Sequence, residues 1–477
     1  MTCLSRTRLA LLSVTLALGV PAARAQLLYD IPRALAPAVA PVGTPPVSGA
    51  GQDPSVVRGD YLARAGDCIS CHTRPGGLPF AGGLPMQTPF GTIVSTNITP
   101  DPGQGIGAYS QQDFSRAMRS GRARDGRHLY PAMPYTHFAK LADADLQDLY
   151  AYFMQGVRPA VQVNATTALS WPFSMRWLMV FWNALYLQDR RYEADPAQDA
   201  AWNRGAYLVQ GLGHCSACHT PRGFTGAEKV TDEKAGDRYL SGALIDGWYA
   251  QPLRNLPGPV GGGLARWSNL DLVDYLKTGR NAHTAAFSAM VEVVGNSTQY
   301  LTRDDLSAVA RYLTSLGPSG GATAASSGVV SGGREAAARP VDASDPTTLA
   351  LRSGDPAALA TRRGALVYLN NCSACHRSDG QGARRTFPML AGSSSVAATD
   401  ATSLIRIVLQ GSAMPHTAEA PSELGMPGLG WRLTDDNVAD VLSFVRSSWG
   451  NQLDPVTATA VAKVRGALAV SAGTASR

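Results

Sequence analysis

Apolar side chains recur three or four positions apart in three stretches of this chain, each opening near a serine or threonine and ending at a glycine. This spacing places the apolar side chains on one face of an α-helix. A glycine directly after the last periodic residue ends such a helix. We therefore predict three amphipathic helices of similar length, over residues 110–121, 268–279 and 402–411.

Each of these helices is preceded by a helix that opens with Arg-Gly and is followed by a second amphipathic helix. The following helices begin at Asp143, Thr302 and Thr434, which we predict as N-caps, and Thr302 with Asp305 resembles a capping box. The Arg-Gly openings are Arg58-Gly59, Arg204-Gly205 and Arg363-Gly364. Because this order recurs three times and no strong run of alternating residues appears, the pattern predicts an all-α fold made of three repeats.

The rest of the chain connects these repeats. Repeats 1, 2 and 3 cover residues 58–165, 196–318 and 347–451. An apolar, aromatic connecting helix is expected over 166–195, and a Gly-, Ala- and Ser-rich linker over 319–346. The tail over 452–477 has weak apolar periodicity, so we expect disorder or a frayed helix there.

The first 25 residues resemble a secretory signal. Two arginines precede an apolar run from Leu9 to Val20, and Ala23-Arg24-Ala25 is a small-x-small cleavage site. Cleavage there would remove Cys3 and lower the formal charge from +6 to +3, which argues against nucleic-acid binding. The alternative is a retained signal anchor, against which the cleavage site argues. A Pro- and Ala-rich arm over 26–57 follows the signal.

A Cys-x-x-Cys-His motif follows the first helix of every repeat. The cysteine pairs are Cys68 and Cys71, Cys215 and Cys218, and Cys372 and Cys375, and the histidines are His72, His219 and His376. Two cysteines at this spacing reach the two vinyl groups of one porphyrin edge, and the next histidine can bind the iron. The sequence therefore predicts three covalently attached haems c, with the histidines as proximal iron ligands. Haem attachment after export points to the bacterial periplasm.

Two other uses of paired cysteines were weighed against haem. A zinc site would need two pairs close together, but the pairs begin 147 and 157 residues apart. A thioredoxin-like pair would need a βαβ pattern, and none is visible. Neither alternative accounts for a histidine directly after every pair.

A second iron ligand is expected after the glycine that ends each middle helix. A methionine there would favour the reduced iron and raise its potential. Met133, Met290 and Met426 occupy this place, 12, 11 and 15 residues after their glycines. Met414 competes with Met426 but follows its glycine by only three residues. A single methionine is often core filler, but three in one position of a repeat favour iron ligation.

Nearby histidines offer a bis-histidine alternative at the same irons. His137, His283 and His416 do not occupy matching positions in the three repeats, so we interpret them as loop histidines. His214, beside Cys215, is expected to be a polar neighbour of the haem.

Several stretches of the chain resemble a known protein family, and they extend beyond the cysteine motifs. They are Gly59-Asp60-Tyr61 to His72, Thr96 to Pro100, Leu129 to Tyr135, Trp202 to Gly223, Asn296 to Gln299 and Trp431 to Asn451. With them the chain resembles the tri-haem cytochrome c subunit of bacterial membrane-bound dehydrogenases for alcohols, aldehydes, gluconate or sugar alcohols. The resemblance runs from about Arg58 to Asn451. It implies three tandem class I cytochrome c-like domains, each wrapped around one covalent haem c.

The resemblance also implies partners. A separate catalytic subunit carrying pyrroloquinoline quinone, flavin or a molybdenum cofactor would oxidise the substrate. This chain, without catalytic chemistry of its own, would pass the electrons to ubiquinone at the periplasmic face of the inner membrane. An independent periplasmic or oxidase-linked carrier is the alternative. A haem peroxidase would need an open axial position, against which a methionine in every repeat argues.

The segment from Trp171 to Leu187 is apolar and aromatic but shorter than the roughly 20 residues that span a bilayer as a helix. No other stretch of the predicted mature chain is long enough, so we expect no transmembrane helix. Trp and Tyr suit the boundary between membrane and water, and the flanking arginines suit lipid headgroups. We therefore predict an interfacial helix. The alternative is a helix buried between repeats 1 and 2 or against a partner subunit, and the two differ in the exposure of Trp177, Phe181 and Trp182.

Overall fold

The first helix of repeat 1 begins earlier than its sequence pattern indicated. The computed structural model describes residues 51, 53–256, 262–317 and 344–475, all within the unit Ala38–Arg477. Helix α2 (Pro54–Ala65) starts four residues before Arg58. Its carboxylate cap is Asp53, which accepts a hydrogen bond from the Ser55 backbone N–H at 2.9 Å, and Pro54 suits the first helical position.

The middle helices lie where the periodicity places them. They are α4 (Gln111–Ser120), α10 (Asn269–Thr278) and α17 (Thr402–Gln410). Ser110 and Ser268 each form a capping box with the aspartate three residues later, which satisfies free N–H groups at the helix start. Gly121 and Gly279 adopt left-handed backbone conformations that end α4 and α10.

The last helices are α6 (Asp143–Ala151), α12 (Arg303–Ser315) and α18 (Asp435–Ser447). Thr302 and Thr434 are N-caps as predicted, and each accepts a hydrogen bond from the backbone three residues on. The prediction for Asp143 is wrong, because Ala142 is the N-cap of α6. The carboxylate of Asp143 instead pairs with Arg119 and Arg191, and it still suits the positive end of the helix dipole.

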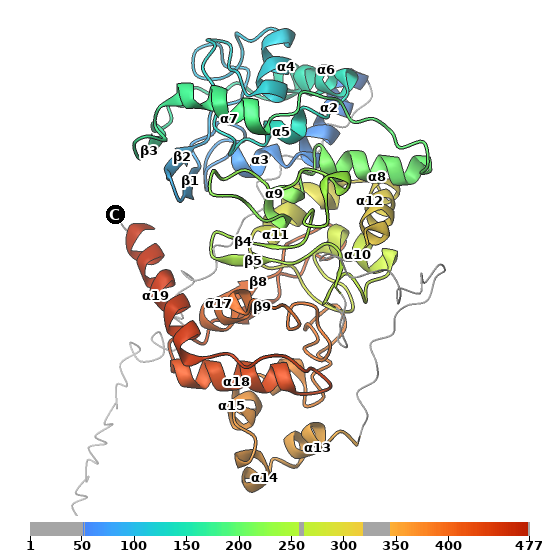
Figure 1. Cartoon of the computed structure of the whole chain (residues 1–477), viewed down its shortest axis with the longest axis vertical. Helices are drawn as coiled ribbons and strands as arrows, with labels where there is room; N and C mark the ends of the chain where they lie inside the picture. Colours follow the sequence, from blue (N-terminus) through green and yellow to red (C-terminus); the bar gives the residue numbers. More distant parts are fainter. Residues whose placement is uncertain (1–50, 52, 257–261, 318–343, 476–477) are drawn as a thin grey trace, which may run out of the picture. The chain divides into compact units, whose positions relative to one another are not determined.

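Shorter elements fill the connections (Figure 1). The short helices are α3 (Cys68–Cys71), α5 (Tyr135–Phe138), α7 (Met179–Tyr186), α9 (Ser216–His219), α11 (Ala289–Glu292), α13 (Pro346–Ser353), α14 (Pro356–Ala360), α15 (Ala365–Asn371) and α16 (Ser373–His376), with α8 (Ala200–Gln210) opening repeat 2. The 3₁₀ and π segments are η2 (Tyr152–Gly156), η3 (Arg176–Leu178), η4 (Glu233–Ala235), η5 (Val293–Ser297) and η6 (Thr298–Tyr300).

The described residues also contain short strands, which the all-α prediction lacked. They are β1 (Pro85–Thr88), β2 (Gly91–Val94), β3 (Ala168–Leu169), β4 (Ala243–Ile245), β5 (Trp248–Ala250), β6 (Asn255–Leu256), β7 (Gly262–Gly263), β8 (Gly411–Ala413) and β9 (Gly425–Pro427). All of their pairings are antiparallel; most close loops between helices, whereas β2 with β3 joins segments on either side of α4–α6. Strands of two to four residues are too short to show an alternating pattern, so the fold is largely helical with β-paired loops.

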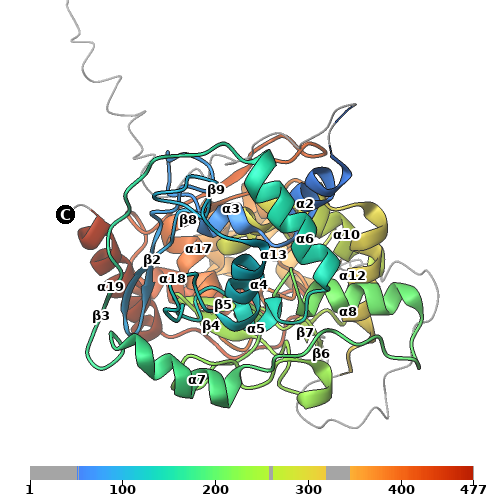
Figure 2. The ribbon, with the colours of Figure 1, turned by 90° about the horizontal axis from the view of Figure 1, so that it is seen from above.

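A glycine in α2, another in α8 and a third at the N-cap of α15 explain the recurring Arg-Gly. Gly59, Gly205 and Gly364 lie against the backbone of the last helix of the same repeat. A Cβ at these positions would come within 2.0, 2.0 and 2.1 Å of the carbonyl oxygens of Asp148, Ala308 and Asp440. The first and last helices therefore cross at a distance that only glycine permits, as α8 and α12 do in both views (Figures 1 and 2).

The hydrophobic cores divide the chain differently from the three repeats. One continuous core joins repeats 1 and 2, from Leu62 and Leu149 to Leu208 and Leu306. Repeat 3 has its own core, which includes Val438. Repeats 1 and 2 thus share one hydrophobic core, in which apolar side chains of each repeat pack against those of the other.

The C-terminal tail is more ordered than expected. Helix α19 (Ala458–Ala475) packs against α17 and α18, and Val461 is fully buried. Arg465 fixes it by hydrogen bonds to Asp435 and to the carbonyls of Gly430 and Leu433. The predicted signal (1–25), nearly all of the arm (26–57) before α2 and nearly all of the linker (319–346) lie outside the described residues.

Candidate functional site: three cysteine–histidine turns

Each cysteine motif forms one helical turn directly after the first helix of its repeat. The backbone N–H of His72 donates to the carbonyl of Cys68 at 3.0 Å, and His219 and His376 bond Cys215 and Cys372 in the same way at 3.0 and 2.9 Å. The histidine therefore lies one turn after the first cysteine. The six motif cysteines form no disulfides with described residues, and the second of each pair is exposed. The three turns thus present the same set of groups in the same local geometry.

The three histidines also share one side-chain contact. Nδ1 of His72 lies 2.7 Å from the carbonyl oxygen of Thr96, that of His219 lies 2.5 Å from Gln251 O, and that of His376 lies 2.8 Å from Pro388 O. A carbonyl can only accept, so Nδ1 carries the proton and Nε2 keeps its lone pair for a metal. Burial lowers the pKa of all three imidazoles, although the same hydrogen bonds oppose this, and the rings remain neutral near pH 7.

The proposed methionines lie in the segment between the middle and last helices. Met133 is half-buried against the core of repeats 1 and 2, and Met290 is half-buried in α11. Met426 lies in β9, opposite Ser412 of β8, and packs against the core of repeat 3. Met414 is buried just after β8, and its backbone N–H donates to Leu424 O at 2.9 Å. One hairpin therefore carries both candidates of repeat 3.

The histidines interpreted as loop residues are held by other partners. His137 lies in α5 and is buried, with Nδ1 3.0 Å from Gln210 O and Nε2 2.7 Å from the Glu228 carboxylate. Because both ring nitrogens are engaged, His137 is a structural residue of a helix and the loop assignment was wrong for it. His283 is buried beside Asp271, whereas His416 is half-exposed near Glu423. His214 packs against Phe138, and burial lowers its pKa to about 4.

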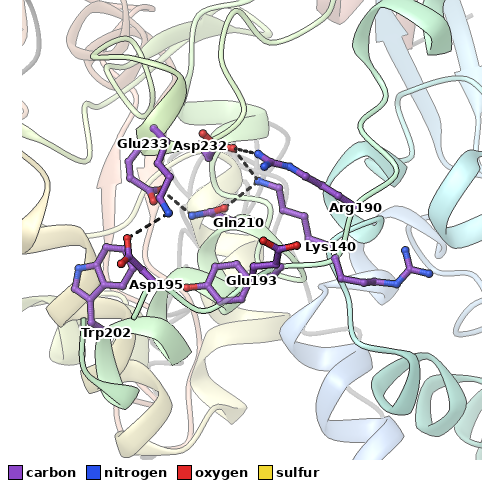
Figure 3. Close-up of a pocket in the computed structure, with 11 residues that line it drawn as sticks. Lys140, Arg190, Glu193, Asp195, Trp202, Gln210, Asp232 and Glu233 are labelled. Atoms are coloured by element: carbon purple, nitrogen blue, oxygen red, sulfur yellow. Dashed lines mark hydrogen bonds and ion pairs between the residues drawn. The ribbon is translucent and has the colours of Figure 1, made fainter. Parts of the chain in front are cut away.

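A polar pocket between repeats 1 and 2 has no part in the cysteine motifs (Figure 3). Lys140 is buried there and donates to the side chain of Gln210 at 2.9 Å and to Thr231 O at 3.0 Å. Arg190 pairs with Asp232 at 3.0 Å, and Gln210 donates to Glu233 at 2.7 Å. Burial lowers the pKa of Lys140, although Asp232 and Glu233 oppose this. These groups form hydrogen bonds and ion pairs with one another across the pocket, and these polar contacts connect the two repeats. No motif in the sequence marked it.

Comparison with known proteins places these turns in a family. The family model named Cytochrome c matches residues 56–156 and 361–449, in repeats 1 and 3. The gluconate 2-dehydrogenase cytochrome c subunit of Pantoea cypripedii is 47% identical over 87% of this chain and 90% of its own length. This chain belongs to the family of cytochrome c subunits of dehydrogenases. The cytochrome c subunits of the quinone alcohol dehydrogenases of Gluconacetobacter polyoxogenes and Gluconobacter oxydans are 45% and 44% identical over 86% of this chain and 84% and 82% of theirs.

The residues of this cytochrome c subunit fit covalent haem c. Free thiol pairs and imidazoles with an open Nε2 are the groups that such a haem requires. The side-chain amide of Gln251, next to the carbonyl that holds His219, is buried with no partner among the described residues, which suits contact with a polar edge of a ligand. Like its relatives, this chain is an electron-transfer subunit and not a catalytic one.

Proposed function

We propose that this subunit takes electrons from a dehydrogenase catalytic subunit and delivers them to ubiquinone through three covalent haems c. The observation that carries the proposal is the threefold recurrence of the imidazole contact, in which Nδ1 of His72, His219 and His376 bonds a backbone carbonyl. A haem c supplies an iron that gains and loses one electron. The relatives' names include gluconate and alcohol dehydrogenases, so the donor is a subunit that oxidises an alcohol or sugar acid.

The chain's own residues would hold each site in the same geometry whether its iron is oxidised or reduced. The two cysteines of each motif would attach one edge of the macrocycle, and the carbonyl bond fixes the tautomer and plane of the proximal imidazole. Met133, Met290 and Met426 are the proposed distal ligands, and they would exclude water or peroxide from the iron. Met426 is preferred over Met414 because it packs against the core of its own repeat, as Met133 does. Met414 is next to Pro415, which contacts Gly279 of repeat 2.

Mass and spectroscopy test this proposal together. The intact mass of the mature holoprotein should exceed that of its polypeptide by three haems. The isolated chain should stay oxidised with gluconate or ethanol and become reduced when the catalytic subunit that co-purifies with it is added. It should then reduce a soluble ubiquinone analogue. Two haems or fewer, or oxidation of substrate by the isolated chain, would overturn the relay. Reduction by the partner without any transfer to quinone would favour the independent carrier.

We propose that the subunit works in the periplasm and attaches peripherally to the inner membrane through α7. None of the helices in the described residues has the length and apolarity to cross a membrane. No side chain of α7 is buried, which argues against the interpretation of this segment as a core helix. Phe181 and Leu185 are 61% and 74% exposed, and Trp177 just before α7 is 58% exposed. These residues with Val180 form one stripe at helical spacing, called the α7 surface.

The polar groups of this segment face the protein instead of solvent. Asn183 accepts a hydrogen bond from the Tyr135 hydroxyl at 2.7 Å, and Trp182 Nε1 donates to Thr225 O at 3.3 Å. Arg176 donates to His128 O at 2.9 Å. A helix that is anchored by its polar side and exposes its apolar side suits the interface of a bilayer. Trp182 is half-buried in this anchor, so it differs from the exposed position expected for it.

Co-sedimentation with vesicles tests the α7 surface. Replacing Trp177, Phe181 and Leu185 with serine should release the holoprotein from vesicles that contain anionic phospholipid while its visible spectrum persists. A matched control replaces Leu78, Leu270 and Leu349, which are also half or more exposed, and should leave binding unchanged. Unchanged binding of the α7 variant would refute the membrane role. If that variant instead lost only the catalytic subunit, the stripe would be a protein contact.

A further inference from the structure

Repeats 1 and 2 exchange equivalent contacts in both directions. The Tyr61 hydroxyl of repeat 1 donates to Asp305 of repeat 2 at 2.5 Å, and Tyr207 of repeat 2 donates to Asp145 of repeat 1 at 2.6 Å. Tyr61 and Tyr207 each stand three residues after the arginine of an Arg-Gly opening, and Asp145 and Asp305 each stand third after a helix cap. Equivalent residues thus meet across the boundary with their roles exchanged, which is the pattern of a twofold axis.

A second contact repeats the exchange one helical turn further along. The guanidinium of Arg64 lies 4.2 Å from the centre of the Tyr300 ring. At the equivalent positions of the other repeat, Gln210 accepts a hydrogen bond from Lys140 at 2.9 Å, seen in Figure 3. The chemistry differs between the two contacts, but the positions match. The quasi-twofold relation therefore extends along the first helices toward the cysteine turns.

A third pair of contacts involves the cysteine turns themselves, although the two serines stand at different positions of their motifs. Ser70, inside the first turn, accepts a hydrogen bond from Asn296 of repeat 2 at 2.9 Å. Ser216, inside the second turn, donates to Glu228 at 2.6 Å, and Glu228 bonds His137 of repeat 1 at 2.7 Å. Repeat 2 therefore contacts the first turn directly, and repeat 1 reaches the second turn through Glu228.

The segments just before the two turns also contact each other. The ring of His214, directly before Cys215, reaches Gly66 O at 3.4 Å. A Cβ on Gly66 would lie 3.2 Å from Leu212.

Among the described residues, the turn of repeat 3 forms its hydrogen bonds within its own repeat. Ser373 donates to Leu369 O, and His376 bonds Pro388 O. Repeat 3 meets repeat 2 elsewhere, through Arg280, which donates to Ser422 O at 2.6 Å, and through Arg266, which donates to Gly392 O at 2.9 Å. The quasi-twofold exchange is therefore a property of repeats 1 and 2.

We infer that the contacts between the first and second cysteine turns join their haem sites into one redox-coupled pair, whereas the third site responds separately. This inference rests on the proposed haem at each motif. An electron that enters one site adds a negative charge near the other site. The coupling needs no other reactant. The boundary between repeats 1 and 2 is poor in water, because Ser216 is fully buried and His137 and Gln210 are nearly so. Charges interact more strongly in such surroundings. The electron affinity of each site therefore depends on the state of the other.

Locking the second site in each oxidation state tests the coupling. Met290→His should lower the potential of that site, so that it stays oxidised while the first is reduced. Met290→Ala with carbon monoxide should hold the same site reduced. We expect the midpoint potential of the first site to be higher in Met290→His than in Met290→Ala with carbon monoxide, and that of the third site to be equal in both. The matched controls, Met426→His and Met426→Ala with carbon monoxide, should leave the first site unchanged.

A second measurement does not depend on the methionine assignment. In the unmodified, fully oxidised holoprotein, two of the three ferric resonances should be broadened by their mutual magnetic interaction, and the third should not. Three unbroadened resonances, or a first-site potential that ignores the state of the second, would overturn the coupling. If Met290→His lowers no potential, the distal ligand is wrong, and the magnetic measurement still decides the inference.

Discussion

Replacing Glu228, at the boundary between repeats 1 and 2, with glutamine should lower the free energy of unfolding by an amount that depends on pH. The Glu228 side chain is 8% exposed and bonds His137 on one oxygen and Ser216 on the other. Burial alone would raise its pKa, but the attraction of His137 and the hydrogen bonds from His137 and Ser216 outweigh burial and bring the pKa to about 2. Relative to the ordinary value of 4.5, this favours the folded state by about 3 kcal/mol at pH 7.

The sign of the pH dependence follows from the lowered pKa. A carboxyl that is more acidic in the folded state stabilises fully above its unfolded pKa of about 4.5 and loses that contribution as pH falls toward 2. Glu228→Gln has no such charge to lose. The free energy of unfolding of the wild-type protein should therefore exceed that of the variant by about 3 kcal/mol at pH 7 and by about 1 kcal/mol at pH 3.

Guanidinium unfolding of the holoprotein, followed by tryptophan emission at pH 7, 5, 4 and 3, measures this difference. The control is Glu423→Gln, because that side chain is 54% exposed and 3.8 Å from His416, and it should change stability by less than about 0.5 kcal/mol. A difference between wild type and Glu228→Gln that stays constant from pH 7 to pH 3 would refute the charge argument and leave only a packing effect.

Three further changes probe the packing and the ligands. Gly205→Ala places a Cβ 2.0 Å from Ala308 O and should cost about 1–3 kcal/mol, whereas Gly466→Ala meets open space in α19 and should stabilise by up to about 1 kcal/mol; opposite shifts in thermal melts check this. Tyr61→Phe and Tyr207→Phe each remove a hydrogen bond to a carboxylate and should each cost about 1.5–3 kcal/mol in guanidinium unfolding, and near-zero costs would show that the crossed contacts contribute nothing. Met426→Leu should remove the ferric charge-transfer band of one haem and Met414→Leu should not, and the reverse result would move the ligand to Met414.

The sequence was sufficient for features that depend on neighbours along the chain. Ser110 and Ser268 cap their helices, and Gly121 and Gly279 end them, because capping and termination involve residues within a few positions. The cysteine motifs also fold locally, since Cys68 and His72 belong to one turn. The family could be predicted from the sequence for the same reason, because its motifs are short and follow one another in a fixed order along the chain.

Partners distant in sequence could not be predicted in this way. Tyr61 and Asp305 are 244 positions apart, and nothing in either neighbourhood indicates that a tyrosine of one repeat serves the aspartate of another. His137 looked like a loop residue because its partner, Glu228, lies 91 positions away. The three distal methionines stay predictions, and in repeat 3 the choice is hardest because Met414 and Met426 lie on one hairpin.

The shared core of repeats 1 and 2 has a consequence for how such chains can be inherited. A recombination event that separated the two repeats would leave apolar surfaces such as that of Leu212, which contacts Gly66, exposed to water. The boundary after α12 is different, because a new core begins in repeat 3 and polar bonds such as Arg266 to Gly392 cross the junction. We therefore expect the first two repeats to be inherited together, whereas the packing would permit the third to be gained or lost separately.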